Sequence, residues 1–310
     1  MLTRAQRQSF DANGYLVVED VFDPVEIKSE YAALLDRLYD QWHDEGFVPE
    51  AIGWEPRLLA AYRAGCDWFQ PMDCSLPGDG ISADTPMYFG PAVFNLITGE
   101  RILDMVEDLI GPEITSNPIQ HIRLKPPATN LTDTEVRAHI TATDWHQDRA
   151  VALEEADQTN MVTVWCAVTD ATPENGCLQV IPRDGPADML PHCPRTQTGI
   201  ADGFINESKA LPLPVRAGGV VIFHPLTPHG SLTNQTDKFR WSFDIRYNRT
   251  GDPTGRSHFP EFVVRSAANP DAEIRDWREM RRAWDEARTR LATQPHIPIH
   301  RWQSDAPYCA

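Results

Sequence analysis

Five apolar segments between residues 114 and 247 constrain the fold of this chain more than any other feature. They cover residues 114–125, 161–168, 177–181, 219–223 and 239–247, and Gly, Pro, Asn and Asp occur between them. Short apolar segments separated by turn-forming residues are typical of the strands of a β-sandwich or barrel. We therefore expect a β core over about residues 114–250.

Helical patterns flank this core on both sides. Apolar residues recur at helical spacing in residues 3–12, after Asp23-Pro24, and in residues 99–110 and 271–291. A short strand is expected at residues 15–18. The sequence has no internal repeat and no Gly/Ser linker, so it predicts one α+β domain over residues 1–310.

Residues 44–90 lack clear periodicity and are rich in Trp, Gly and Pro. A long irregular segment of this kind is typical of loops that cover a functional site. We expect it to form part of a substrate lid, with Trp54, Trp68 and Phe69 as candidate walls.

The charge balance excludes some partners. The chain carries 28 Lys and Arg residues against 45 Asp and Glu residues, a formal net charge of −17. Such a surface repels phosphate backbones and anionic lipids, so we expect neither nucleic acid nor membrane as a partner. The oligomeric state is not indicated.

The even number of cysteines permits disulfides but does not require them. None of the 6 cysteines forms a C-x-x-C pair, and a chain of 310 residues can bury a large core without disulfides. We expect reduced, mostly structural thiols. The N-terminal residues lack the apolar core of a signal peptide, and no apolar run is long enough to span a membrane, which together favour the cytoplasm.

The first stretch that indicates chemistry is Trp145-His146-Gln147-Asp148. His and Asp two positions apart point to the same side of an extended chain. An imidazole together with a carboxylate suits Fe(II), but a catalytic ion needs a third protein ligand from elsewhere. Because His-x-Asp is common by chance, this stretch alone is weak evidence.

A second histidine stretch follows the apolar segment that ends at residue 223. His224 and His229 both lie at the expected mouth of the β core and compete for the role of third ligand. We favour His229 because Ser231 shares its face and a basic strand comes next.

That strand, residues 240–247, alternates in character. Trp241, Phe243 and Ile245 point to one side, and the charged or polar residues point to the other. The latter are Arg240, Ser242, Asp244 and Arg246. The polar face either meets water or lines an interior pocket, where an arginine would bind a carboxylate through two hydrogen bonds.

Taken together, these motifs resemble the phytanoyl-CoA dioxygenase family of Fe(II)/2-oxoglutarate-dependent oxygenases. The matching stretches are residues 145–148, 175–182 and 218–240, and the strand at 15–18 and the closing helix also fit. The resemblance implies a double-stranded β-helix core, also called a jelly roll or cupin-like fold, with flanking helices. It also implies hydroxylation of a small or medium organic molecule with Fe(II), 2-oxoglutarate and O2, releasing succinate and CO2.

The resemblance also implies roles for single residues. The iron ligands fall on His146, Asp148 and His229. The residues expected to bind 2-oxoglutarate are Arg240, Ser231, Trp165, His121 and Arg123, with Arg240 on the distal carboxylate. Trp145 and Arg246 are weaker candidates for substrate contact. Asp148 favours hydroxylation or desaturation over halogenation, because related halogenases lack this carboxylate.

Several alternatives stay open from the residues alone. Trp165 is also compatible with core packing, His121 and Arg123 with pairing to acidic neighbours, and Arg246 with pairing to Asp244. Lys125 is expected to be a solvated strand end. Residues 183–185 depart from the Gly-Ser-His usual in the family, so no role is assigned to them. At the level of function, a cupin-type metal enzyme without 2-oxoglutarate and a non-enzymatic β-barrel binding protein are the competing hypotheses.

Overall fold

A computed structural model describes residues 1–66, 69–78, 80–128, 143–183, 185, 187–194, 198–295, 299 and 301–309. Trp68, one of the expected lid residues, lies outside this described part.

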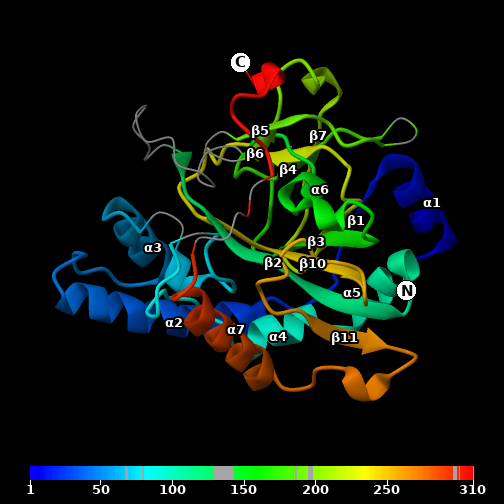
Figure 1. Cartoon of the computed structure of the whole chain (residues 1–310). Coiled ribbons are helices and arrows are strands. Elements are labelled where there is room, and N and C mark those ends of the chain that lie inside the picture. The colour runs from blue at the N-terminus through cyan, green and yellow to red at the C-terminus, as the bar shows by residue number, and fades with distance from the viewer. Residues whose placement is uncertain are drawn as a thin grey trace.

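Two antiparallel sheets form the centre of the molecule (Figure 1). The larger sheet has the strand order β1-β8-β3-β10-β2-β11 and the smaller one the order β7-β4-β9, while β5 and β6 pair as a hairpin. The strands of the larger sheet are β1 (Tyr15–Val18), β8 (Val220–Phe223), β3 (Met161–Ala167), β10 (Arg240–Arg249), β2 (Glu113–Lys125) and β11 (Phe262–Ser266). The remaining strands are β4 (Leu178–Val180), β5 (His192–Pro194), β6 (Thr198–Ile200), β7 (Leu211–Leu213) and β9 (His229–Ser231). The predicted jelly-roll core with flanking helices is confirmed.

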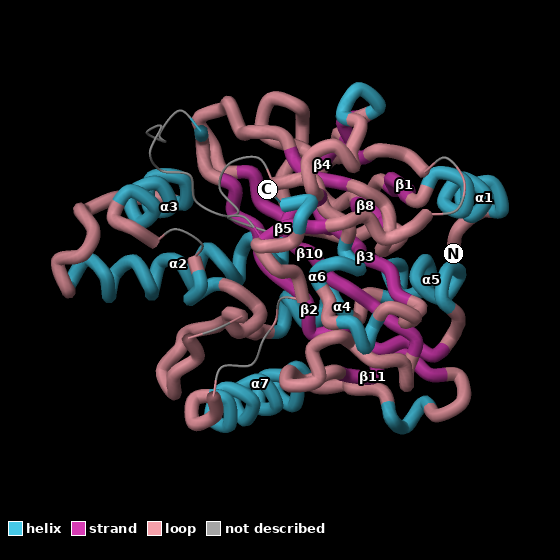
Figure 2. The backbone as a smooth tube through the Cα atoms, turned by 45° about the horizontal axis from the view of Figure 1, so that its top comes forward, coloured by secondary structure: helices cyan, strands magenta, loops and turns pink. Residues whose placement is uncertain are grey.

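Helices cover the outer side of the larger sheet, as Figure 2 shows for α2, α4 and α7. The helices are α1 (Arg4–Asn13), α2 (Val25–Asp44), α3 (Trp54–Arg63), α4 (Pro91–Ile97), α5 (Glu100–Ile110), α6 (Asp148–Val151) and α7 (Trp277–Leu291). Buried side chains of all these helices except α6, together with those of β10, share one hydrophobic cluster. Tyr31 of α2, for example, lies with its ring centroid 5.4 Å from that of Trp241 and 5.6 Å from that of Phe243.

The turn after α1 places the first strand against the loop that holds the candidate histidines. Gly14 ends the helix with φ 78°, a left-handed conformation that glycine adopts without steric cost. A Cβ atom at Gly14 would lie 2.2 Å from Oγ1 of Thr227. The Thr227 hydroxyl donates a hydrogen bond to the Gly14 carbonyl, 2.8 Å long, and so ties the loop before His229 to β1.

The segment 44–90 differs in part from the expectation. It contains helix α3, and Trp54 at its start stacks on Trp241 with ring centroids 4.9 Å apart. Phe69 is 1% exposed and packs edge-on against Phe239. Phe69 therefore belongs to the hydrophobic core and Trp54 packs against it, and neither lines the cavity within the described residues, because Phe239 and Trp241 offer them apolar partners.

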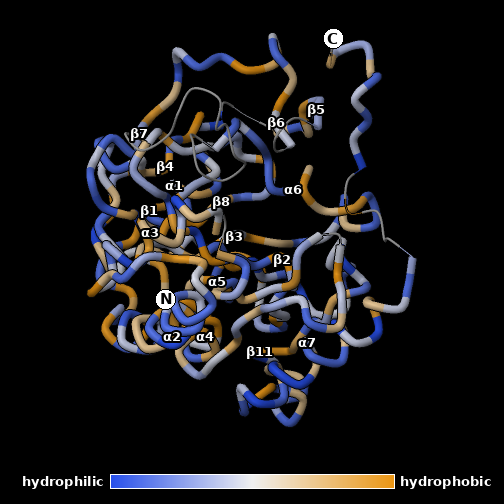
Figure 3. Tube along the Cα trace, turned by 90° about the vertical axis from the view of Figure 1, so that its left-hand side faces the viewer, coloured by the Kyte–Doolittle hydropathy of each residue, from blue (hydrophilic) through white to orange (hydrophobic). Residues whose placement is uncertain are grey.

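The expectation of reduced cysteines is wrong for one pair. Cys193 and Cys309 form a disulfide with Cα atoms 5.5 Å apart, although 116 positions separate them in sequence. The C-terminal tail folds back onto the β5–β6 hairpin, as Figure 3 shows, and this return brings the two thiols together. Trp302 in the same tail donates from Nε1 to the Ala150 carbonyl at 2.9 Å.

Among the described helices, none combines the length and the apolar composition that a membrane span requires.

Candidate active site

Two short backbone hydrogen bonds join the segments that carry the candidate ligands. His146 and His229 form an antiparallel bridge, with the His146 amide 2.9 Å from the His229 carbonyl oxygen and the His229 amide 3.0 Å from the His146 carbonyl oxygen. Asp148 follows two positions later as the first residue of α6. His146 and His229, which are 83 positions apart in sequence, are thus held side by side by main-chain hydrogen bonds.

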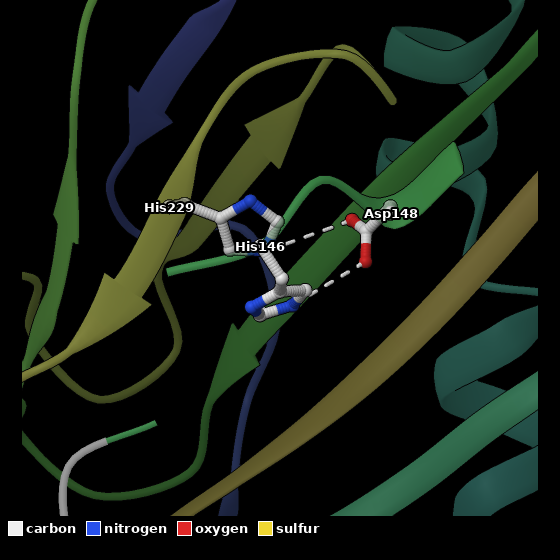
Figure 4. A group of neighbouring side chains, drawn as sticks. All are labelled: His146, Asp148 and His229. Atoms are coloured by element: carbon white, nitrogen blue, oxygen red, sulfur yellow. Dashed lines mark ion pairs between the residues drawn. The ribbon is translucent and has the colours of Figure 1, made fainter. Parts of the chain in front are cut away.

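The three side chains converge on one point (Figure 4). One potential ligand atom from each of His146, Asp148 and His229 lies within 4.8 Å of the others. Nε2 of His146 is 3.8 Å from Oδ1 of Asp148, and Nε2 of His229 is 3.7 Å from Oδ2. The structure therefore brings together the three residues that the sequence analysis assigned to iron.

The backbone orients both imidazoles. Nδ1 of His146 lies 2.9 Å from the Asp144 carbonyl oxygen, and Nδ1 of His229 lies 3.0 Å from the Thr227 carbonyl oxygen. With Nδ1 as the donor in each contact, Nε2 presents its lone pair to the centre of the group. This is how metal-binding histidines are usually held in proteins.

The Asp148 carboxylate is buried and lacks one partner. Its Oδ1 atom accepts a hydrogen bond from Nη2 of Arg246, whereas Oδ2 has no hydrogen-bond donor within the described residues. Burial raises the pKa of Asp148, but Arg246 and the histidines outweigh this and hold it below its ordinary value. A buried, ionised oxygen without a donor is suited to a cation.

The His146 imidazole is also held in the neutral form that a metal requires. Burial, with His229 as the next cause, lowers the pKa of His146 to about 3. A neutral imidazole and an ionised carboxylate are the forms that coordinate a metal. Two histidines and one carboxylate on one side of an open space match the ligand set of non-haem Fe(II) oxygenases.

His224, the competing candidate, lies elsewhere. Its ring centroid is 6.5 Å from that of Phe10, and its Nδ1 accepts a hydrogen bond from the Leu226 amide at 3.2 Å. His229 instead stacks on Phe223 at a centroid distance of 4.3 Å. The preference for His229 over His224 agrees with this geometry.

A cavity of about 390 Å³ lies beside the three converging side chains. The predicted site residues that line it are His121, Arg123, His146, Asp148, Trp165, His229, Ser231, Arg240 and Arg246. From the expected lid, Ser75, Leu76 and Gly78 reach the lining. Trp145 does not line the cavity within the described part of the chain, because neighbours in an extended segment point to opposite sides and His146 points inward.

Arg240 marks one end of the cavity. Its guanidinium donates to the Ser242 hydroxyl at 2.7 Å and lies 5.1 Å from the ring centroid of Trp165. The side chain is 3% exposed, and burial lowers the pKa of Arg240 to about 10. No carboxylate of the described residues forms an ion pair with it, so an anionic ligand would supply the missing charge.

Lys125 lies at the same end and was not expected there. The predicted solvated position is wrong: Lys125 is 2% exposed, and its Nζ donates to the Ser231 hydroxyl at 2.7 Å. Burial, followed by the nearby Arg240, holds the pKa of Lys125 well below its usual range. The register of β2 against β10 pairs Lys125 with Arg240, and this pairing is the signal that a strand alignment would have given.

Ser231 is already engaged in this arrangement. Its hydroxyl donates to Oγ1 of Thr143 at 2.8 Å while it accepts from Lys125. A ligand that met this hydroxyl would also lie next to Lys125.

The remaining predicted residues are held by acidic partners. His121 contacts Asp73, with Nδ1 2.9 Å from Oδ2, and Arg123 donates from Nε to Oδ2 of Asp244 at 2.7 Å. Arg246 pairs with Asp148 and not with Asp244, the partner considered from the sequence. All three nevertheless face the cavity.

Known proteins resemble this chain in sequence and in fold. Residues 93–242 match the family model described as phytanoyl-CoA dioxygenase, and the match includes all three converging residues. The chain is thus similar to the phytanoyl-CoA dioxygenase family over almost half of its length. Human peroxisomal phytanoyl-CoA dioxygenase is 31% identical over 162 residues, which are 50% of this chain and 45% of the human protein. A probable phytanoyl-CoA dioxygenase of Caenorhabditis elegans is 24% identical over 258 residues, covering 80% of this chain and 75% of that protein.

Solved structures show the same fold. The apo structure of the non-heme monooxygenase ThoJ has a TM-score of 0.58 and 19% identity, and the match covers 92% of this chain and 97% of ThoJ. The non-heme alpha ketoglutarate dependent epimerase SnoN from nogalamycin biosynthesis has a TM-score of 0.50 and 25% identity, covering 81% of this chain and 85% of SnoN.

Proposed function

We propose that this protein is an Fe(II)/2-oxoglutarate-dependent oxygenase of the phytanoyl-CoA dioxygenase family that hydroxylates a small or medium organic molecule and releases succinate and CO2. The observation that carries the proposal is the convergence of His146, Asp148 and His229 beside a cavity lined by Arg240, which has no ion-pair partner among the described residues. Iron(II) held there supplies the activation of O2, and 2-oxoglutarate supplies the electrons.

The triad residues would hold the ion on one face only. His146 and His229 contribute Nε2, because their Nδ1 atoms are engaged by backbone carbonyls. Asp148 contributes Oδ2, the oxygen that lacks a donor among the described residues. The cavity beside these three side chains would admit the co-substrate and O2.

Arg240 would bind the distal carboxylate of 2-oxoglutarate. Its guanidinium is fixed by Ser242 and by the Trp165 ring, so little side-chain freedom is lost when the carboxylate binds. Lys125 and Ser231 stand next to it as further donors. An alpha ketoglutarate dependent neighbour of the same fold, SnoN, supports this assignment.

Walls of mixed character are consistent with a small organic substrate. Leu76, Val151, Phe259 and Ile299 give the cavity apolar surface, while His121 and Ser75 give it hydrogen-bonding groups. Such a mixture is typical of ligand sites in enzymes. Single-domain organisation, a cytoplasmic location, and the absence of nucleic acid and membrane as partners stay predictions.

The direct test is the visible charge-transfer band that an Fe(II)–2-oxoglutarate chelate gives under anaerobic conditions. We expect the band with the wild-type protein and its loss in His229→Ala, since two ligands do not hold the chelate. His224→Ala is the matched control: it removes a histidine five positions earlier in the same loop, outside the cavity, and should keep the band.

The competing functions give different results. A cupin-type metal enzyme without 2-oxoglutarate would bind Fe(II) but form no band and release no succinate. A non-enzymatic binding protein would bind no iron at all in elemental analysis. Wild-type protein that takes up iron yet shows no band on addition of 2-oxoglutarate would refute the proposal.

A further inference from the structure

The arginines that line the cavity fall into two groups. Arg123 pairs with Asp244 and Arg246 pairs with Asp148. Arg240 and Arg256 form no ion pair with any carboxylate in the described ranges. In a chain with a net charge of −17, two buried guanidinium groups in one cavity that have no ion-pair partner among the described residues indicate anionic ligands.

Arg256 is buried and held by neutral groups alone. It is 5% exposed, and its Nη1 and Nη2 atoms donate to the carbonyls of Gly255 at 2.8 Å and Val151 at 2.6 Å. A guanidinium has five N–H donors, so these bonds leave part of it available. Burial, followed by repulsion from Arg246, lowers the pKa of Arg256 to about 10.

A second buried arginine shows what a purely structural role looks like. Arg149 is 7% exposed and donates to the carbonyls of Ala156, Asp157 and Thr159. Its side chain does not reach the cavity within the described lining. Arg256 shares the carbonyl contacts but faces the cavity, and this difference points to a ligand.

Arg256 lies away from the end that would bind 2-oxoglutarate. It adjoins Arg246, whereas Arg240 stands at the opposite end of the polar face of β10, roughly 20 Å away along the strand. Asp148 contacts Arg246, so the triad adjoins the arginine that lies next to Arg256. A 2-oxoglutarate molecule bound to Arg240 would therefore leave Arg256 without an ion-pair partner among the described residues.

The surroundings of Arg256 fit the body of an organic acid. Val151 supplies a carbonyl to the guanidinium and an apolar side chain to the cavity, and Phe259 follows Arg256 by one turn and lines the same wall. We propose that Arg256 binds a carboxylate of the organic substrate, whose carbon skeleton lies along Phe259 and Val151 and reaches the triad. This inference rests on the proposed function and narrows its substrate to organic acids.

The test compares acids with their neutral amides. Anaerobic protein saturated with Fe(II) and 2-oxoglutarate, which occupies Arg240, is titrated calorimetrically with phenylpropanoate, phenylpropanamide, octanoate and octanamide. We expect at least one acid to bind the wild-type protein about tenfold or more tighter than its amide, as a hydrogen bond between charged groups supplies.

Variants assign the preference to one side chain. Arg256→Gln should abolish the preference for the acid, and Arg256→Lys, which keeps the charge, should retain part of it. Arg249→Gln is the matched control, because Arg249 is exposed and pairs with Asp252 outside the cavity. It should leave the preference unchanged.

The outcomes separate the two proposals. The charge-transfer band is recorded on the same samples, and its absence in wild type overturns the proposed function and this inference with it. A normal band with no preference for either acid, or a preference that survives in folded Arg256→Gln, overturns the assignment of Arg256 alone. If Arg256→Gln does not fold, the wild-type comparison still decides whether the cavity prefers an acid to its amide.

Discussion

The two faces of strand β10 carry different tasks. Trp241, Phe243 and Ile245 are at most 2% exposed and pack against the helices, with Tyr31 and Trp54 as aromatic partners. The opposite face lines the cavity with Arg240, Asp244 and Arg246. One face stabilises the fold through apolar burial, while the other holds charged groups whose burial costs free energy unless partners or ligands neutralise them.

This contrast shows how one strand can serve both stability and chemistry. Side chains alternate between the faces, so a change on one side leaves the neighbours on the other largely in place. Substitutions on the apolar face should therefore change the free energy of unfolding, and substitutions on the polar face should change ligand binding. The following predictions test that division, from the largest expected effect to the smallest.

Phe243→Ala should lower the free energy of unfolding by about 3–5 kcal/mol, because it leaves a cavity in the hydrophobic core. Urea unfolding of the metal-free protein measures this loss. The affinity for 2-oxoglutarate, read from the chelate band at low temperature, should stay close to that of the wild type. If the free energy of 2-oxoglutarate binding fell by as much as the free energy of unfolding, the two faces of β10 would not have separate roles.

The tail that folds back to the β5–β6 hairpin belongs with the stabilising elements. Replacing Cys309 by Ser should lower the free energy of unfolding by about 2–4 kcal/mol, since the disulfide restricts the unfolded chain. Dithiothreitol should destabilise the wild-type protein by a similar amount and leave the variant unaffected. Cys166→Ser, at a buried free thiol, is the comparison for the loss of a cysteine as such.

Arg240→Gln should weaken 2-oxoglutarate binding by about 10–100-fold, because a charge-assisted pair is lost. The free energy of unfolding of the metal-free protein should hardly fall, since the guanidinium has no acidic partner among the described residues. Titration of the chelate band and urea unfolding measure the two quantities. A stability loss as large as that of Phe243→Ala would show that both faces serve the fold alike.

The pH dependence of stability tests the contact between His192 and the segment that carries His146 and Asp148. His192 accepts a hydrogen bond from the Gln147 amide at 3.1 Å, and burial, with a smaller contribution from Arg301, lowers its pKa from 6.5 to about 4. The unfolded chain therefore binds the proton first, so the stability from neutral His192 is complete above about pH 6.5 and is lost as the pH falls towards 4. At pH 5 we expect a loss of about 1–2 kcal/mol relative to pH 7.

His192→Gln provides the control for this pH effect. Its free energy of unfolding should fall less between pH 7 and pH 5 than that of the wild type. Parallel pH profiles for the two proteins would assign the acid sensitivity to other groups, such as His224 and His258, whose pKa values burial lowers to about 4.

Much of the site could be predicted because it is local in sequence. His146 and Asp148 are two positions apart, and Arg240 follows His229 at the spacing that the family resemblance implies. The strand pattern likewise predicted the β core, since alternation and turn residues act over short stretches. The structure confirms the fold class that these features predicted.

Other features depend on contacts that no local pattern encodes. Arg246 turns to Asp148 because the register of β2 against β10 shifts between Asp244 and Arg246, where the Ile119 carbonyl accepts from the guanidinium at 3.0 Å. Lys125 was placed in solvent because strand ends usually are, yet the return of residues 229–232 buries it. The disulfide between Cys193 and Cys309 depends in the same way on a distant contact, that of the C-terminal tail with the β5–β6 hairpin.

By itself, then, the sequence determined the alternation of β10, the His-x-Asp pair and the succession of strands, because each is set by the geometry of neighbouring residues. The tertiary structure alone decided which charges inside the cavity are neutralised and which are not. That choice depends on which distant carboxylates approach within hydrogen-bonding distance, and it is the reason why Arg240 and Arg256 stand out only after folding.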